Sequence, residues 1–203
     1  MTEYIDCSII CNPFSKDYTI LAVQRLYDQI FQAGQLALLW SILSRHACYL
    51  IDLAKVWSTC KVCGCRNIGR HRIPICKIKG SAGRCQDFDL NFHPLNLHTQ
   101  HRWLGIALAR RRGKKLPPVA LIQIRDFYFV EDGHHRISVA KALGETEVEA
   151  NVIVWDVVGT LPWEETRRAS TPILKRLWEV NFGKWIGLIS RHASRHDFGM
   201  GRC

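Results

Sequence analysis

Residues 127–144 constrain the fold of this chain more than any other stretch, because they predict a strand, a tight turn and a helix in immediate succession. The segment opens with Phe-Tyr-Phe-Val at 127–130, residue types that favour strands. Asp132-Gly133 breaks this run, and apolar side chains then recur at helical spacing from Ile137 until Gly144 ends the pattern.

The turn at 133–136 has the features of an anion site. Gly133 lets the backbone approach a ligand closely, and the first amides of a helix have no partners within the helix. Arg136 adds a planar cationic fork that suits phosphate oxygens. His134 and His135 can add donors, or move a proton near neutral pH. The alternative interpretation is an Asp-Gly turn with a cationic helix start that holds no ligand.

The motif Asp132-Gly133-His134-His135-Arg136, with its flanks from Leu116 to about Val157, resembles the ParB/sulfiredoxin superfamily, in the branch with a DGHHR-type box. The resemblance covers roughly residues 73–157, under half of the chain. It implies a small mixed sheet with flanking helices, in which the box begins a helix and holds nucleotide phosphates. In this superfamily the box serves a CTPase in ParB, an ATP-using reductase in sulfiredoxin and an ADP-dependent kinase in the archaeal free serine kinases.

Two departures from the family narrow what the resemblance implies. Sulfiredoxin has a cysteine where His134 stands, so reductase chemistry is not expected here. The ParB box reads Gly-Glu-Arg-Arg, so its CTP contacts are not carried over. Residues 158–203 are also too few for the large helix-turn-helix domain that follows the box in ParB, which argues against centromere binding.

The resemblance also implies that the loop after the first strand faces the nucleotide. The expected phosphate-binding residues are Arg84, Asp132, Gly133, His134, His135 and Arg136. The expected catalytic residues are Asp87, Asp89, His134 and His135. The expected ligand is ATP, ADP or CTP, with Mg²⁺ held by Asp132, Asp87 or Asp89. For Asp87 and Asp89 a simpler alternative is that each carboxylate caps a turn through nearby backbone amides.

Periodicity and turn residues predict an α/β (α+β) core over residues 73–157. Strands are expected at about 73–78, 119–124, 127–130 and 148–155, with a hairpin turn at Arg125-Asp126, and helices at about 94–112 and 134–143. Residues 1–72 are expected to be a loosely ordered start followed by an N-terminal helical extension with a Cys-rich basic segment, and 158–203 a helical tail. The extension shows helical patterns from Tyr18 to Gly34 and from Leu36 to Trp57, as a hairpin or one broken helix that covers the core or forms a homodimer.

The charge of the chain favours anionic partners. Lysine and arginine number 28 against 18 acidic residues, which gives a net charge of +10 and a pI near 9.4. Residues 55–86 contain no acidic side chain, and a second basic cluster occupies 110–115. These segments are typical of a solvated linker or of a surface that follows a nucleic-acid backbone.

The nine cysteines and the N-terminus predict a reduced, cytoplasmic protein without a tightly bound metal. Residues 1–6 lack the basic start of a secretory signal. Cys60 and Cys63 have the spacing of a zinc knuckle, but the second half of a standard ligand set is missing, so zinc is not expected. The most apolar run, 36–43, is shorter than the roughly 20 residues that cross a bilayer, so no membrane segment is expected.

Three functions remain open from the sequence. The leading hypothesis is a nucleotide-binding protein that transfers or hydrolyses a phosphoryl group at the box. The second is a ParB-like, nuclease-type protein that binds DNA or another nucleic acid without catalysis on nucleotides. The third is an inactive interaction module that dimerises through its N-terminal helices. Binding that falls steeply with salt distinguishes a nucleic-acid surface from a nucleotide pocket.

Overall fold

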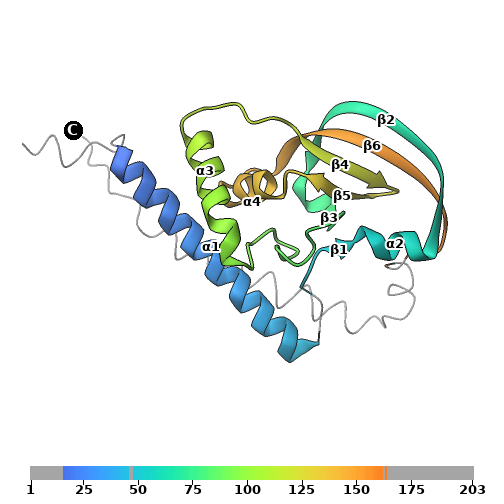
Figure 1. Cartoon of the computed structure of the whole chain (residues 1–203), viewed down its shortest axis with the longest axis horizontal. Coiled ribbons are helices and arrows are strands. Elements are labelled where there is room, and N and C mark those ends of the chain that lie inside the picture. Colours follow the sequence, from blue (N-terminus) through green and yellow to red (C-terminus); the bar gives the residue numbers. More distant parts are fainter. Residues whose placement is uncertain (1–15, 46–47, 162, 164–203) are drawn as a thin grey trace, which may run out of the picture. The chain divides into compact units, whose positions relative to one another are not determined.

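The computed structural model describes residues 16–45, 48–161 and 163 (Figure 1). Its six-stranded mixed sheet has the order β1-β3-β5-β4-β6-β2. The strands are β1 (Ile51–Asp52), β2 (Cys60–Pro74), β3 (Ile78–Ser81), β4 (Val119–Ile124), β5 (Phe127–Asp132) and β6 (Glu147–Gly159). The α-helices are α1 (Lys16–Ser44), α2 (Leu53–Thr59), α3 (Gln100–Arg111) and α4 (His134–Ala142), and short 3-10 turns lie at η1 (Ile75–Lys77) and η2 (Leu97–Thr99).

The functional box leaves the sheet from one of its two central strands. β5 is parallel to β3 and antiparallel to β4, to which it is joined by the turn at Arg125-Asp126. β4 is parallel to β6, and β6 pairs antiparallel with the edge strand β2. The chain therefore turns at Gly133 from a strand with neighbours on both sides directly into α4.

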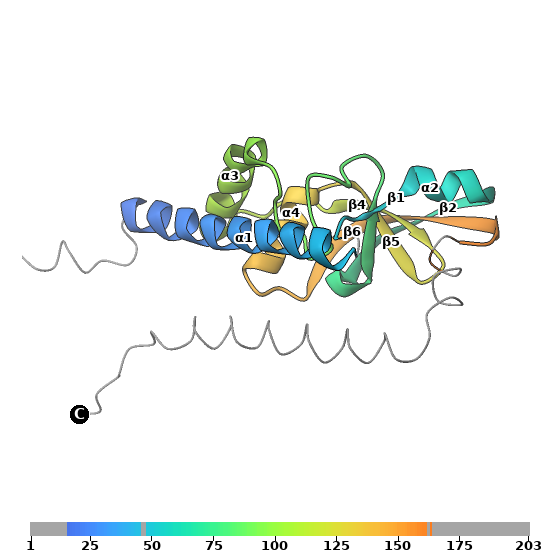
Figure 2. The ribbon, with the colours of Figure 1, turned by 90° about the horizontal axis from the view of Figure 1, so that it is seen from below.

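Helix α4 lies between the sheet and α3 and packs apolar side chains against both. Its residue Ile137 belongs to the main core cluster together with Leu121 of β4 and Val130 of β5. On the other side, Val139 packs with Trp103 of α3, whose indole N–H donates to the Ser138 hydroxyl at 2.9 Å. Figure 2 shows α1 lying beside this helix pair, and the contacts of its N-terminal half complete the second cluster, which contains Val23, Tyr27, Trp103, Ala107 and Val139.

The expected fold class is confirmed: a mixed α/β sheet with flanking helices follows a long N-terminal helix. The predicted strands at 119–124, 127–130 and 148–155, the hairpin turn between the first two and the helix at 134–143 are confirmed to within a few residues. These elements could be predicted because their apolar periodicity and turn residues agree with the buried and exposed sides that they have in the structure.

The expected strand at 73–78 is wrong. The basic segment from Cys60 to Pro74 is itself the strand β2, residues 75–77 form η1, and β3 begins at Ile78. β2 pairs along almost all of β6, but two register shifts, between Val62 and Gly64 and between Asn67 and Gly69, interrupt its alternation. Because β2 is an edge strand with mostly exposed side chains, it lacks an apolar pattern. The expected domain boundary between residues 72 and 73 falls inside this strand.

The helical predictions on either side also need correction. α1 continues through Gly34 and ends at Ser44, so the expected helix from Leu36 to Trp57 does not form as one element. α2 begins separately, after Asp52 caps it by accepting from the Ala54 amide at 2.9 Å. α3 starts at Gln100 rather than near 94, because the chain first passes through η2. The predictions for residues 1–15 and 164–203 lie outside the described residues.

No helix in the described part of the chain is long and apolar enough to cross a membrane.

The close approach of β3 to β5 at Gly80 provides a test of this fold. A Cβ at Gly80 would collide with the Phe129 ring and lie 2.6 Å from the Ile51 carbonyl oxygen. We expect Gly80→Ala to lower the free energy of unfolding by at least about 1–3 kcal/mol in denaturant titrations. Gly105→Ala on α3 is the control: its Cβ meets nothing within 4 Å, so it should be neutral or stabilise by about 0.5–1 kcal/mol. Equal effects of the two changes would contradict the β3–β5 pairing.

Candidate functional site

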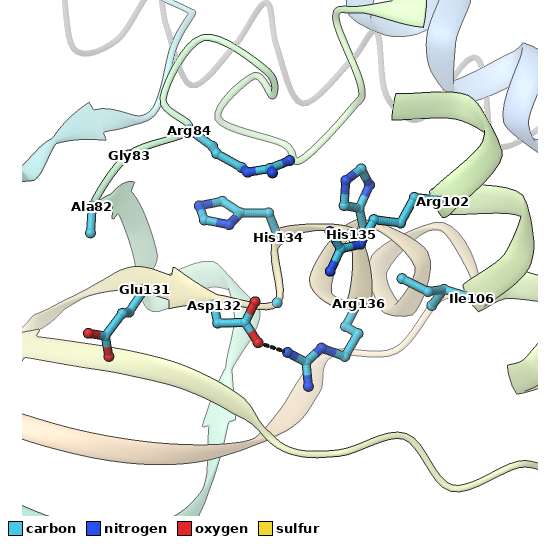
Figure 3. A pocket seen from close by; sticks show the side chains of 11 residues that line it. Ala82, Gly83, Arg84, Arg102, Ile106, Glu131, Asp132, His134, His135 and Arg136 are labelled. Atoms are coloured by element: carbon cyan, nitrogen blue, oxygen red, sulfur yellow. Dashed lines mark hydrogen bonds and ion pairs between the residues drawn. The ribbon is translucent and has the colours of Figure 1, made fainter. Parts of the chain in front are cut away.

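A cavity of about 380 Å³ lies at the start of α4 (Figure 3). Three parts of the chain form it: the loop after β3, the first half of α3, and the segment from the end of β5 into α4. Its lining residues are Ala82, Gly83, Arg84, Arg102, Ile106, Glu131, Asp132, Gly133, His134, His135 and Arg136. All six of the predicted phosphate-binding residues are therefore brought together around one space.

Gly133 makes the sharp turn into α4 possible. Its φ of 104° is in the region that favours glycine, and an added Cβ would lie 2.6 Å from Cγ1 of Val119. Among the described residues, no side chain caps the helix at this position. The first amides of α4, at His134 to Arg136, precede the first intrahelical bond, from Ile137 N–H to the Gly133 carbonyl. The helix start therefore presents free donors and a positive dipole end.

His134 is held in one tautomer by Ser81. The Ser81 hydroxyl oxygen accepts from the amides of Gly83 at 3.2 Å and Arg84 at 2.8 Å, which uses both of its lone pairs. Its own proton must then be donated to Nε2 of His134, 2.7 Å away. Nε2 is consequently an acceptor, and the neutral ring carries its proton on Nδ1.

Both histidines of the box are buried against Phe88. The His134 ring stacks on Phe88 with ring centroids 6.0 Å apart, and the His135 ring meets Phe88 edge-on at 5.3 Å. Burial, followed by the nearby charge of Arg84, lowers the pKa of His134 from 6.5 to about 4. Burial, followed by the charge of Arg102, lowers the pKa of His135 to about 4 as well. The expected proton shuttle near neutral pH is thus not supported, because both rings are neutral there.

His135 has an unused polar atom. The side chain is 5% exposed, and its Nδ1 is buried without a hydrogen-bond partner among the described residues. A buried nitrogen without a partner costs free energy. His135 lines the cavity, so it is a group whose hydrogen bonding the protein alone does not complete.

Arg136, the expected phosphate fork, uses its terminal nitrogens for contacts within the protein. Its Nη1 donates to the carbonyls of Pro117 at 2.8 Å and Pro118 at 2.9 Å, and Nη2 donates to the Asp132 carboxylate. The dashed line in Figure 3 marks this last contact. Arg136 lies at the cavity wall, but its terminal nitrogens tie the box to the chain segment that enters β4.

Two other arginines supply the positive charge of the cavity. Arg84, in the loop after β3, faces Asp87 with Nη1 3.7 Å from Oδ2, too long for a hydrogen bond. Arg102, from the first turn of α3, is exposed, and in the described part of the chain no carboxylate forms an ion pair with it. Arg84 was expected at the site, whereas Arg102 was missed. Helical periodicity placed Arg102 on the surface but could not show which element its helix faces.

The two expected catalytic aspartates of the loop lie outside the lining of the cavity. Asp89, 1% exposed, accepts from the amides of Asn91 and His93, each at 2.8 Å, and from Nδ1 of His93 at 2.9 Å. Asp87 accepts from the Asn96 side chain at 3.1 Å. The alternative interpretation of turn capping is therefore correct for Asp89, and its expected role as a catalytic base is not supported.

The carboxylates that do line the cavity are Glu131 and Asp132, at the end of β5. Both are exposed, and Asp132 is the partner of Arg136. Within the described residues, no group of three or more His, Cys, Asp or Glu side chains could hold a metal ion. The knuckle cysteines Cys60 and Cys63 lie on β2 with Cys65; Cys60 is buried, Cys63 and Cys65 are exposed, and no disulfide joins any of them to another described cysteine.

Comparisons with known proteins give little beyond the fold class. No protein-family model matches the chain, and no curated protein matches it. The crystal structure of sulfiredoxin from Arabidopsis thaliana is similar with a TM-score of 0.32 and 18% sequence identity, over 41% of this chain and 82% of that chain. This likeness is weak and supports neither an activity nor the DGHHR branch, so the function must be argued from the cavity.

The role of Arg136 can be separated from ligand binding by stability measurements. Arg136→Ala would leave two carbonyls without their donors and remove contacts to a charged group, so we expect a loss of about 1.5–3 kcal/mol in the free energy of unfolding without ligand. Arg136→Lys should recover only part, because an ammonium cannot span the same acceptors. Asp132→Asn is the control, since its exposed ion pair should contribute under about 1 kcal/mol. An Arg136→Ala variant as stable as the wild type would contradict the structural role.

The buried histidines should make stability depend on pH. In the folded chain they stay neutral down to about pH 4, whereas in the unfolded chain they take up protons near pH 6.5. Protons thus favour the unfolded state. The two histidines therefore leave the free energy of unfolding unchanged above pH 6.5 and lower it as the pH falls from 6.5 toward 4. We expect the melting temperature to fall between pH 6.5 and about pH 5, before most carboxylates titrate. A double variant with His134→Gln and His135→Gln should show a smaller slope, and an unchanged slope would refute this assignment.

Proposed function

We propose that this protein binds a nucleotide by its phosphate groups in the cavity at the start of α4. The observation that carries this proposal is the uncapped start of α4, whose free amides follow Gly133 and open into a cavity flanked by Arg84 and Arg102. Amides at a helix start and guanidinium groups are donors that recognise phosphate oxygens.

The size of the cavity supports a small ligand in this place. The His135 ring is part of the cavity lining, but its Nδ1 is buried and is not an atom that a ligand reaches directly. The cavity volume of about 380 Å³ falls within the range of small-ligand sites.

A magnesium ion can accompany the nucleotide. Mg²⁺ is usually held by one or two carboxylates together with substrate phosphates, and it keeps several waters. Glu131 and Asp132 are the carboxylates of the cavity lining, and both are exposed. Asp132 is paired with Arg136, and Asp87 and Asp89 are used by hydrogen bonds within the loop, so among these carboxylates Glu131 fits such a shared ion best.

Binding is the part of the function that the geometry supports best. Transfer or hydrolysis of the phosphoryl group also needs a base for the acceptor or water. The two histidines have pKa values of about 4, and Asp89 is enclosed by its own turn. The other carboxylates at the cavity are Glu131 and Asp132, and turnover of a bound Mg²⁺-nucleotide tests whether the site supplies a base.

Nucleic-acid binding is the second candidate, on the strength of the edge strand β2. Lys61, Arg66, Arg70 and Arg72 are all exposed along this strand. Charged side chains on an edge strand also prevent pairing between copies, so the pattern has a structural explanation. Log affinity for duplex DNA would fall with log salt by about 0.9 for each phosphate neutralised, and a nucleotide pocket should depend far less on salt.

Calorimetry with ATP, ADP, CTP and GTP, each with and without Mg²⁺, tests the proposal. Pyrophosphate and the parent nucleosides form the comparison set, because phosphate recognition requires pyrophosphate to bind and the nucleosides to bind poorly. We expect Arg84→Ala and Arg102→Ala each to weaken nucleotide binding about 10- to 150-fold, the equivalent of roughly 1.5–3 kcal/mol.

The matched control is Arg111→Ala. It removes the same charge from the same helix as Arg102, but Arg111 is exposed in the last turn of α3 and does not line the cavity. Wild-type affinity is expected for this variant. Equal losses in Arg111→Ala and Arg102→Ala would show a general charge effect, and absence of nucleotide binding by the wild type would refute the proposal.

A further inference from the structure

Helix α1 carries two apolar stripes, and only one of them is covered by other described residues. Val23 and Tyr27 in the first half are 1% exposed and pack on α3. In the second half, Leu36, Leu39, Trp40 and Leu43 are 57%, 58%, 60% and 79% exposed. Their spacing of i, i+3, i+4 and i+7 places these four side chains, the distal stripe, on one face of the helix.

The distal stripe lies on the face of α1 opposite to the face that packs on α3. At 3.6 residues per turn, Leu36 lies about 220° around the helix from Val23, which is nearly the opposite side. In the second half of α1, the face that continues the first stripe contacts the loop before η2. Gly34 lies against the Pro94 carbonyl, and the Gln35 side-chain amide donates to the Leu95 carbonyl at 2.9 Å. The distal stripe therefore takes no part in the contact between α1 and the other described elements.

We infer that the distal stripe pairs with the distal stripe of a second copy, so that two α1 helices form an antiparallel homodimer. Residues 29–44 contain no charged side chain, so this face offers nothing to attract a charged partner, and two copies bring no like charges together within it. The net charge of +10 lies elsewhere in the chain, and its repulsion is screened beyond about 8 Å at physiological salt.

The stripe is self-complementary under a two-fold axis. In an antiparallel pair with the axis between residues 39 and 40, Leu36 faces the second copy's residue 43, and Leu39 faces residue 40. The same set of residues is thereby used on both sides, as an isologous interface requires. Each Trp40 ring then covers a leucine of the other copy.

The available area suits a modest dimer. Stable interfaces start at about 600 Å² on each partner. Four large side chains that are more than half exposed supply on the order of 500 Å² on each copy, slightly below that size. We therefore expect a weak, reversible dimer rather than an obligate one.

Sedimentation equilibrium of the full chain at about 0.15 M salt tests the dimer. The wild type is expected to move from monomer to dimer across micromolar concentrations, and Leu39→Lys to weaken association on the order of 100-fold by placing two ammonium groups in an apolar contact. Leu21→Lys is the matched control: the same change on the same helix, at a side chain 57% exposed but outside the distal stripe, should leave the dimer intact.

A charge-complementation experiment tests the antiparallel register. Leu39→Lys and Trp40→Glu should each be monomeric, while an equimolar mixture should dimerise, because residue 39 of one copy faces residue 40 of the other. A monomeric wild type would overturn the proposal, and so would a wild type that stays monomeric but sediments with anionic vesicles, which would assign the stripe to a lipid surface. A large loss of melting temperature in Leu39→Lys, measured at a concentration at which the wild type is also monomeric, would overturn it as well, since the stripe would then be covered within one copy.

Discussion

The turn at Gly133 is the constraint on which the site depends. Its positive φ reverses the chain between a central strand and α4, and Val119 leaves no room for a side chain there. Arg136, one helical turn later, binds the carbonyls of the two prolines that precede β4 and the carboxylate of Asp132. Strand end, helix start and the entrance to β4 are thereby held as one unit, and the first amides of α4 are left facing the cavity.

The chemistry of the cavity follows from burial. Phe88 packs against both histidines, and removal from water makes protonation of either ring costly. Ser81 fixes the tautomer of His134 while its oxygen closes the turn at Gly83 and Arg84. Because both rings are neutral, the positive charge of the cavity comes from Arg84 and Arg102 and from the helix start, and the proposed anion binding rests on these groups.

The cavity depends on the layers around it. α4 is buried on both sides, and α3 brings Arg102 to the cavity only because Trp103, the next residue, is anchored in the second core cluster. α1 in turn covers α3 with its first half. The second half continues past Gly34 without covering the core, and this leaves an apolar face for contact with another copy.

The sequence by itself determined the centre of the molecule. The strands at 119–124 and 127–130, the turn at Gly133 and the helix that follows could be predicted because their propensity, periodicity and turn residues all agree with their final environment. Tertiary structure decided what is locally ambiguous. β2 has no apolar pattern because an edge strand needs none, and Gly34 lies inside α1, where the Pro94 carbonyl leaves no room for a side chain. Sequence also placed arginines and aspartates near the site, but only the packing decided that Arg136 and Asp89 complete the protein's own hydrogen bonds while Arg84 and Arg102 flank the cavity. The physical reason is that a side chain's residue type fixes its charge and donors, whereas the groups within reach of those donors are fixed by segments far away in the chain.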